Sequence, residues 1–177
     1  MVFLYEGKAM IKLVSISDLA DWREVDRVQR LAYSSDLVED IEVLKEKADI
    51  LGHFCFLIQD ELTHHVLGYV LAHPYSRTQI PPLNSKKLSS INSEETNVFL
   101  HDMALNPSCS GRGLGKLTVE RLLSEVKSKG AKSMTLVAVQ ASSSFWSKVA
   151  GFEVVNSADE ASLAKYGNGA KMMRVEL

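Results

Sequence analysis

Hydrophobic and polar positions alternate along the chain in a pattern that predicts short strands and amphipathic helices. For the first half the pattern predicts, in order, a strand over residues 10–16, a helix over 18–33, a helix over 38–50, and two hairpin-connected strands over 54–59 and 66–72. We expect Asp18 to cap the first helix, whose apolar residues recur every three positions, and Gly52 to end the second.

The second half of the chain has the clearer pattern. It predicts, in order, a strand over residues 98–105, a helix over 112–129, a strand over 134–139, a short helix over 142–149, and closing strands over 152–155 and 172–175. Asn106-Pro107 stops the first of these strands, and Gly130 is suited to end the long helix. The element order β-α-α-β-β-β-α-β-α-β-β indicates a mixed α/β domain.

The length of 177 residues suits one compact domain. We place that domain at residues 10–177, after an N-terminal extension over residues 1–9. Residues 74–96 contain Pro81-Pro82, several serines and few large apolar groups, which predicts a long surface loop. Loops of this length are uncommon and are often functional.

Composition and charge narrow the classes of partner. The formal net charge of −2 disfavours a protein that holds nucleic acid mainly by charge, so we expect no nucleic-acid partner. No apolar run is long enough to cross a membrane, and the first residues do not resemble a secretory signal. Cys55 and Cys109 cannot form a disulfide framework, which fits a reducing compartment, so we expect a cytoplasmic protein, or a nuclear one in a eukaryote.

A glycine-rich segment between the strand 98–105 and the following helix is the strongest chemical signal. Gly111, Gly113 and Gly115 alternate in Ser-Gly-Arg-Gly-Leu-Gly-Lys, where a helix begins. The first amides of a helix are unpaired and its dipole is positive there, so a phosphate or pyrophosphate is a natural ligand. The spacing fits neither the dinucleotide fingerprint nor the Walker loop. A turn that merely joins strand to helix remains the alternative.

This segment and its surroundings resemble the GNAT superfamily of N-acetyltransferases. The resemblance lies in Asp102-Met-Ala-Leu-Asn-Pro107, Gly111-Arg-Gly-Leu-Gly115, Phe145-Trp146 and Gly151-Phe152, in this order, and it covers about residues 10–177. It implies a mixed, mostly antiparallel twisted sheet flanked by helices. It also implies an enzyme that transfers the acetyl group of acetyl-CoA to a primary amine by direct attack in a ternary complex.

The resemblance assigns cofactor-binding residues position by position. The main chain of Met103, Ala104 and Leu105 would face the pantetheine arm. Apart from the resemblance, Ser143 or Ser144 would contact the thiol or the pantetheine, and we select Ser143. The pyrophosphate would meet the amides of a continuous segment: Ser110, Gly111, Arg112, Gly113, Leu114, Gly115 and Lys116. Ser110 stands where the superfamily usually has Gln or Arg, so we expect weakened rather than lost cofactor binding.

His101 is the candidate base. Strand alternation places it on one face with Met103 and Leu105 and turns Asp102 to the other face, where a structural role is favoured. The strand is most similar to the catalytic strand of arylalkylamine N-acetyltransferases, where a histidine at the matching position takes part in deprotonation. Imidazole titrates near neutral pH, which suits that task. A histidine that only hydrogen-bonds within the core remains the alternative.

The proton donor to the leaving thiolate is less defined. The superfamily usually has a tyrosine where this chain has Trp146, and an indole is not a practical acid. Ser143, Ser144 and Tyr166 are the replacements that the sequence offers, and we select Tyr166. Phe145 and Trp146 are then core aromatics. No His, Cys, Asp or Glu spacing resembles a metal site, so we expect no metal.

The acceptor is the least constrained element of the prediction. The acidic segment 33–40, with Glu39, Asp40 and Glu42 near the cavity mouth, would attract a cation, and a solvated helix face is the alternative. We favour a small primary amine over a peptide N-terminus or a lysine side chain. A non-catalytic acyl-CoA-binding module and a plain interaction domain remain open. The resemblance also allows a homodimer.

Overall fold

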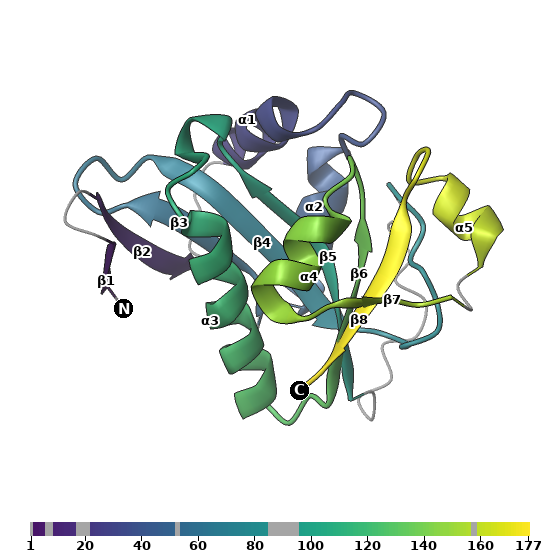
Figure 1. Cartoon of the computed structure of the whole chain (residues 1–177). Coiled ribbons are helices and arrows are strands. Elements are labelled where there is room, and N and C mark those ends of the chain that lie inside the picture. Colours follow the sequence, from purple (N-terminus) through teal and green to yellow (C-terminus); the bar gives the residue numbers. More distant parts are fainter. Residues whose placement is uncertain (1, 6–8, 17–21, 52–53, 85–95, 157–158) are drawn as a thin grey trace.

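The computed structural model describes residues 2–5, 9–16, 22–51, 54–84, 96–156 and 159–177. Its centre is a sheet of eight strands in the order β1-β2-β3-β4-β5-β6-β8-β7 (Figure 1). The strands are β1 (Val2–Tyr5), β2 (Ala9–Ser15), β3 (Phe56–Asp60), β4 (Val66–Pro74), β5 (Asn97–Leu105), β6 (Ser133–Ala138), β7 (Glu153–Val154) and β8 (Lys171–Glu176). The helices are α1 (Arg23–Ala32), α2 (Ile41–Leu51), α3 (Leu114–Ser128), α4 (Ser143–Ala150) and α5 (Glu160–Ala164).

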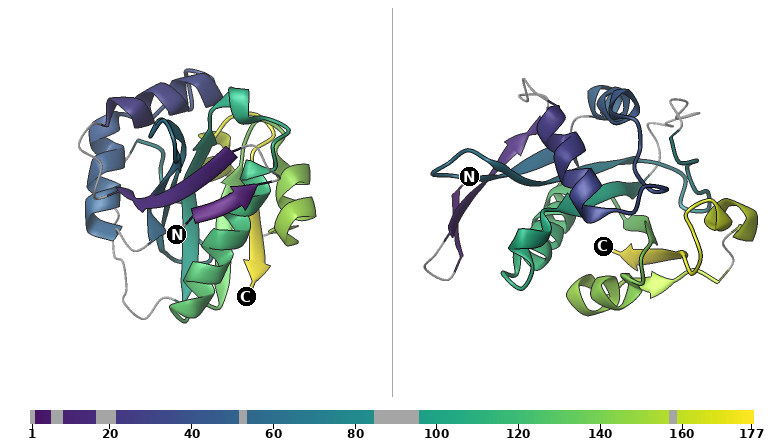
Figure 2. Two further views of the ribbon diagram at one scale, coloured as in Figure 1. Left: turned by 90° about the vertical axis from the view of Figure 1, so that its left-hand side faces the viewer. Right: turned by 90° about the horizontal axis from the view of Figure 1, so that it is seen from above.

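Helices cover both faces of the sheet. Figure 2 shows α1 and α2 on one face and α3 and α4 on the other. The apolar stripe of α3, with Val119, Leu122 and Val126, packs with Trp146 of α4 on one side of the sheet. The corresponding core under α1 and α2 contains Val25, Val28, Leu44 and Ala48. All strand pairs are antiparallel except β5–β6, so the predicted mixed, mostly antiparallel sheet is confirmed.

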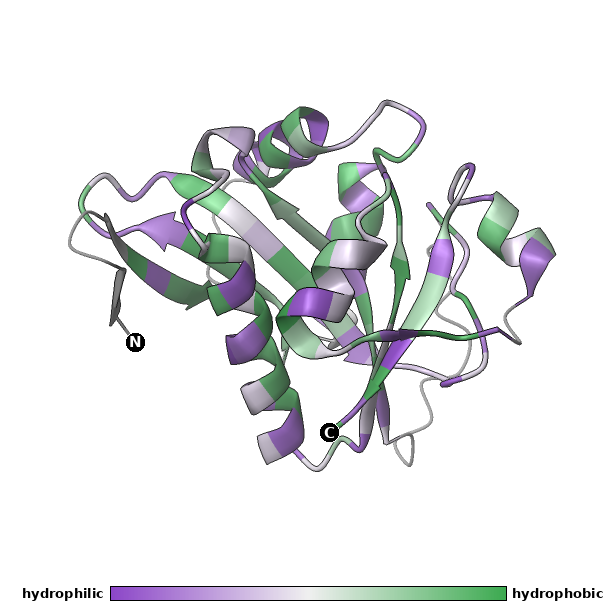
Figure 3. Cartoon of the chain, in the orientation of Figure 1, coloured by the Kyte–Doolittle hydropathy of each residue, from purple (hydrophilic) through white to green (hydrophobic). Residues whose placement is uncertain are grey.

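The structure confirms the predicted burial of the central strands and the predicted end of the long helix. The predominantly apolar strands lie at the centre of the sheet (Figure 3), and β6 is buried along most of its length, as its continuous apolar run predicts. The long helix ends at Ser128, and Gly130, just beyond the C-cap Lys129, adopts a φ of 89°. There the amide of Ala131 donates to the carbonyl of Val126, closing the helix end.

Other ends differ from the prediction. Helix α1 begins at Arg23 with Trp22 as its N-cap, and the predicted cap Asp18 and helix end Gly52 lie outside the described residues. Strand β4 ends at Pro74, two residues beyond the predicted end at residue 72. The predicted loop over 74–96 is described only as far as residue 84 and again from residue 96. Its described part is anchored by buried Tyr75, Ile80 and Pro81.

The prediction has no counterpart for β1 or for helix α5. Residues 2–5, expected in an N-terminal extension, form β1, an edge strand paired with β2. Helix α5 is one short stretch capped by the Asp159 side chain, which accepts from the amide of Ala161 at 3.1 Å. Segments of four or five residues are too short to show a hydrophobic period, so the pattern could not identify them.

Strands β5 and β6 run side by side and then separate. Their parallel pairing extends only from Asn97–Leu100 on β5 and Ser133–Leu136 on β6. Strand β5 then continues to Leu105 without further pairing to β6. The main chain of β5 beyond Leu100 is therefore exposed along an opening in the sheet.

A β-bulge interrupts β5 at this point. On β4, consecutive residues Leu71 and Ala72 pair with Asp102 and Leu100, so His101 is an extra residue. The bulge resets the alternation. Met103 packs with the α3 and α4 side, whereas the Asp102 carboxylate meets Tyr33 at the end of α1. The predicted opposition of His101 and Asp102 is wrong, because strict alternation holds only in a strand without a bulge.

Candidate active site

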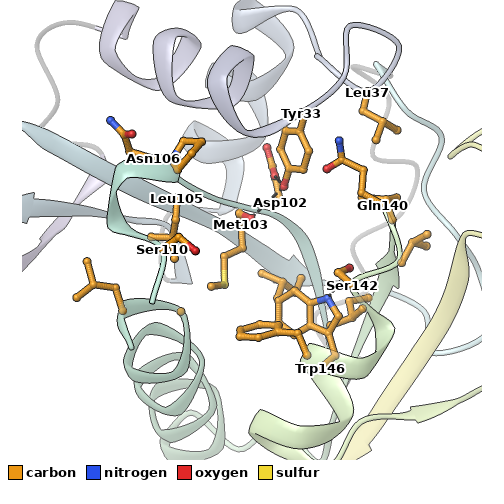
Figure 4. Close-up of a pocket in the computed structure, with 18 of the residues that line it drawn as sticks. Tyr33, Leu37, Asp102, Met103, Leu105, Asn106, Ser110, Gln140, Ser142 and Trp146 are labelled. Atoms are coloured by element: carbon orange, nitrogen blue, oxygen red, sulfur yellow. Dashed lines mark hydrogen bonds between the residues drawn. The ribbon is translucent and has the colours of Figure 1, made fainter. Parts of the chain in front are cut away.

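A cavity of about 600 Å³ occupies the opening between β5 and β6 (Figure 4). Its wall combines segments from both faces of the sheet. Tyr33 and Asp102 lie together on one side, across from Ser142 and Trp146, with Met103 between them. The cavity is therefore a passage through the sheet with chemically different sides.

Most of the residues expected at the site line this cavity. They are His101, Met103, Leu105, Ser110, Gly111, Gly113, Leu114, Gly115, Lys116 and Tyr166. Ala104, Arg112 and Ser143 are not among the lining residues of the described chain. Ala104 is 1% exposed and packs in the core under α1 and α2, because the bulge turns its side chain there. Ser142 lines the wall next to Ser143.

The glycine-rich segment forms a tight loop that points helix amides at the cavity. Gly111 and Gly113 have φ of 73° and 72°, the left-handed region that favours glycine. Gly113 is the N-cap of α3, and the amide of Leu117 is the first in the helix to bond back, to the carbonyl of Gly113 at 3.1 Å. The amides of residues 114–116 therefore have no partner within the helix and suit an anionic group.

Gly115 has a different role from the one its spacing suggests. A Cβ at this position would lie 3.1 Å from Cζ of Phe145, so the glycine lets α3 approach α4. Trp146 next to it packs edge-on against Phe145 and Phe152, and its Nε1 donates to Oγ of Ser142 at 3.2 Å. Trp146 is thus a core aromatic that also forms part of the cavity wall.

His101 belongs to a buried network with Glu39 and Lys47. Its Nε2 lies 2.6 Å from Oε1 of Glu39 and 2.6 Å from Nζ of Lys47, and Nζ donates to Oε2 of Glu39 at 2.8 Å. The His101 side chain is 0% exposed, and its Nδ1 has no hydrogen-bond partner among the described residues. The imidazole therefore borders the cavity but has no exposed surface.

Charges in this network compensate one another. Burial pushes the pKa of Glu39 up, but the bonds and charges of His101 and Lys47 outweigh it and bring that pKa down to about 2. Burial lowers the pKa of Lys47, against the opposing charge of Glu39. Burial, with the nearby His101, lowers the pKa of His73 to about 3. Glu39, expected to attract a cation at the mouth, is already paired with a lysine.

Asp102 belongs to a second network, with two tyrosines. Tyr33 Oη lies 2.6 Å from Oδ1 of Asp102 and 2.9 Å from the carbonyl oxygen of Met103. Tyr69 Oη donates to Oδ2 at 2.5 Å. Burial raises the pKa of Asp102, although the two hydroxyl bonds act in the opposite direction. Tyr33 and Asp102 line the cavity, whereas Tyr69 is absent from its described lining.

Tyr166 lies on the cavity wall, in the connection between α5 and β8. Its hydroxyl donates to the carbonyl of Pro81, which ties this connection to the segment after β4. Burial raises the pKa of Tyr166 above its ordinary value. Tyr166 is 6% exposed and lines the cavity.

Sequence reasoning did not identify Tyr33, Lys47 and Gln140 as site residues. Lys47 carried a signal, because it interrupts the apolar stripe of α2 beside Leu44 and Ala48. Gln140 carried none, since its place on the cavity wall depends on a left-handed turn with φ of 50°. The partners of Tyr33 are 69 and 70 residues away in the chain.

No group of three or more His, Cys, Asp or Glu side chains in the described part of the chain could hold a metal ion. No helix there is long and apolar enough to span a membrane.

Comparisons with known proteins agree with this geometry. Residues 17–152 match the model of the acetyltransferase (GNAT) family. No curated protein matches the sequence. Among solved structures, a chain of the NatC complex bound to Gag peptide and CoA aligns with a TM-score of 0.68 at 12% identity, covering 94% of this chain and 98% of that chain.

Two other solved structures are similar in fold. The ribosomal-protein-S18-alanine N-acetyltransferase from Escherichia coli has a TM-score of 0.64 at 13% identity, with 94% of each chain covered. The C-terminal condensation domain of Ebony in complex with beta-alanyl-dopamine has a TM-score of 0.67 at 11% identity, covering 96% of this chain and 100% of that chain. At these identities the likeness shows a shared fold.

Proposed function

The chain belongs to the acetyltransferase (GNAT) family, which makes it an acetyl-CoA-dependent N-acetyltransferase, and from that premise we propose that its acceptor is a small primary amine. We propose direct attack of the amine on the thioester within a ternary complex. One observation supports this most: the opening between β5 and β6 leads directly to the unpaired amides at the start of α3. A diphosphate at those amides would direct a thioester into the opening.

The proposed seat of acetyl-CoA uses two kinds of main-chain group. The amides of Gly111 and of residues 113–116 would bind the diphosphate, assisted by the positive end of α3. The amides of Ser110 and Arg112, which the sequence also suggested, already donate to the carbonyls of Pro107 and Cys109. The edge of β5 that β6 leaves uncovered, at Met103 and Leu105, would bind the pantetheine arm, although the carbonyl of Met103 also accepts from Tyr33 at 2.9 Å. An amide of the same edge would stabilise the oxyanion that forms during attack.

The acceptor side of the cavity supports a small amine with an apolar part. Leu37 and Leu83 provide apolar wall, and the rings of Tyr33 and Tyr166 provide aromatic wall. An arylalkylamine fits this chemistry. A peptide N-terminus is the second candidate, because two similar folds are an S18-alanine N-acetyltransferase and a NatC chain bound to a peptide. The Ebony domain, in complex with beta-alanyl-dopamine, supports the small-amine choice.

Proton transfers complete the proposal. The amine must lose a proton before attack, because an alkyl ammonium has a pKa near ~10.4. His101 is the acceptor expected from the sequence, and Asp102 is the second group on β5 that the structure offers. The leaving thiolate needs a proton or a hydrogen bond, for which Tyr166 remains our proposed donor.

Thiol release measured over a panel of acceptors tests this function. We expect turnover with 2-phenylethylamine or a related small amine, and little with peptides that carry a free N-terminus or a lysine. Turnover on peptides alone would overturn the small-amine proposal. Acetyl-CoA binding without turnover on any acceptor would favour the non-catalytic module. Light scattering of the purified protein tests the homodimer.

A further inference from the structure

Two acceptors compete for the single hydrogen of the Tyr33 hydroxyl. The oxygen lies 2.6 Å from Oδ1 of Asp102 and 2.9 Å from the carbonyl oxygen of Met103. Tyrosine has one O–H donor. When Asp102 is ionised, the hydroxyl can donate to only one of the two, and the other oxygen has no hydrogen from this group.

One added proton satisfies every contact in the network. A protonated Asp102 donates from Oδ1 to Tyr33, the Tyr33 hydrogen then turns to the carbonyl of Met103, and Tyr69 continues to donate to Oδ2 at 2.5 Å. Buried polar groups are costly when unpaired, so this environment favours uptake of a proton. The ionised network can therefore take up one proton at Asp102, which lines the cavity together with Tyr33.

We infer that Asp102 is the group that accepts the proton of the acceptor amine, with Tyr33 as the relay between them. The inference rests on the proposed function and names the acid–base residue of that site. It replaces the assignment of His101, which the unbroken strand pattern favoured.

His101 is poorly placed for the same task. It borders the cavity, but its side chain is 0% exposed, and its Nε2 lies 2.6 Å from both Glu39 and Lys47, so it either donates to the carboxylate or accepts from the ammonium. A base must come within hydrogen-bond reach of the proton, directly or through one intermediate. The described structure gives Asp102 such an intermediate in Tyr33, which lines the cavity.

The surroundings of Asp102 are consistent with proton uptake. Tyr33 from the end of α1, Tyr69 from β4 and His101 on β5 face it, and the charges of Glu39 and Lys47 and the hydroxyl of Tyr166 also act in this cluster. Burial raises the pKa of Asp102. Burial and Asp102 raise the pKa of Tyr33 well above its ordinary value, so Tyr33 passes a proton on without remaining ionised.

The proton balance of the reaction is closed. The ammonium gives one proton to Tyr33, which gives its own to Asp102, and a neutral amine results. The nitrogen lone pair forms a bond to the thioester carbon, and the carbon–sulfur bond breaks with its electron pair on sulfur. Tyr166, the proposed donor, gives its hydroxyl proton to the thiolate and recovers the second nitrogen proton. After the amide leaves, Asp102 returns its proton to solvent.

The test is the pH dependence of kcat/KM for 2-phenylethylamine, measured in a matched set of variants. We expect Asp102→Asn to lower kcat/KM by about 100-fold and to remove the acid limb of the profile. Tyr69→Phe removes the hydroxyl bond to Oδ2 of Asp102, and Tyr69 does not line the cavity. Because that bond stabilises the ionised carboxylate, its loss should mainly move the acid limb to higher pH. Tyr33→Phe moves the limb likewise and also lowers the plateau.

The outcomes separate this inference from its competitors. A purely structural network would give equal losses of thermal stability in Tyr33→Phe and Tyr69→Phe, with the limb at the wild-type pH. Loss of the limb in His101→Gln but not in Asp102→Asn would restore His101 as the base. Calorimetry of acetyl-CoA binding shows whether Asp102→Asn is folded.

A second readout does not depend on turnover. In protein with ¹³C-labelled aspartate, one carboxyl resonance should titrate above the ordinary aspartate range, move further in Tyr69→Phe and vanish in Asp102→Asn. An ordinary titration would overturn the inference. Absence of thiol release by the wild-type enzyme on every acceptor would instead overturn the proposed function.

Discussion

Lys47 shows how a single residue can organise a site that it does not line. Its side chain is 2% exposed on the inner side of α2, where the ammonium holds the Glu39 carboxylate at 2.8 Å. Burying such a pair adds little net stability, because desolvation offsets the attraction, but breaking it leaves an uncompensated charge. Lys47 therefore keeps the connection between α1 and α2 against β5, where Glu39 contacts His101.

Replacement of Lys47 by methionine should lower the free energy of unfolding by about 3–5 kcal/mol, since Glu39 would remain buried without its cation. Urea denaturation measures this change. Lys45→Met is the matched control, because Lys45 pairs at 2.6 Å with the more exposed Glu42 on the same helix. Similar losses in both variants would contradict the assigned role of Lys47.

Glu39 predicts a pH dependence of stability. Its pKa is about 2 in the folded protein, against an ordinary value of 4.5. A lowered folded-state pKa means that this contribution is fully present above pH 4.5 and is lost as the pH falls towards 2. In urea denaturation across this pH range, the free energy of unfolding should fall more steeply with falling pH for the wild type than for Glu39→Gln. Parallel curves would show that Glu39 is not the group concerned.

At the scale of elements, the extra residue in β5 determines which side chains meet. Without the bulge at His101, Asp102 would face α3 and α4, away from Tyr33. With it, His101 and Asp102 both contact groups from the α1–α2 layer. The start of α3 is a second example, because two left-handed glycines direct the first amides of the helix towards the cavity.

Gly113→Ala should weaken acetyl-CoA binding about 5- to 30-fold, because a left-handed conformation costs alanine roughly 1–2 kcal/mol and the loop would relax away from it. Isothermal titration calorimetry measures the affinity. Gly130→Ala introduces the same strain at the opposite end of α3, at a φ of 89° with nothing within 4 Å of the added Cβ. It should lower stability and leave the affinity near wild type. Equal weakening in both would exclude a local role for Gly113.

At the scale of the whole molecule, the cavity exists because two neighbouring strands separate. Parallel pairing of β5 and β6 ends at Leu100 and Leu136, and helices from opposite faces of the sheet then contribute to one wall. Neither layer alone encloses the site. A ligand that fills the opening would contact both helical layers and should therefore stabilise the whole fold against unfolding.

Acetyl-CoA at about 100 times its Kd should raise the melting temperature by about 5–10 °C, from roughly 2.7 kcal/mol of binding free energy and about 2–4 °C per kcal/mol at this size. Thermal scanning fluorimetry measures the shift. Pantetheine, which lacks the diphosphate, should give a much smaller one at the same concentration. An equal shift would mean that the amides of α3 do not bind the diphosphate.

Periodicity alone predicted the elements that are long enough to show it. The stripes of α1 and α3, the apolar run of β6 and the glycine-rich entry to α3 depend on neighbours within a few residues, so the sequence by itself determined them, together with the family that they resemble. Local spacing also predicted that the loop before α3 would present amides to an anion.

Only the tertiary structure decided which side chains work together. Tyr33 meets Asp102 across 69 residues of chain, and Glu39 meets His101 across 62. Both contacts depend on how α1 and α2 pack on the sheet and on one unpaired residue in β5. A pattern of alternating positions contains no information on where a strand bulges, because the bulge is set by pairing with a neighbouring strand that lies far away in the sequence.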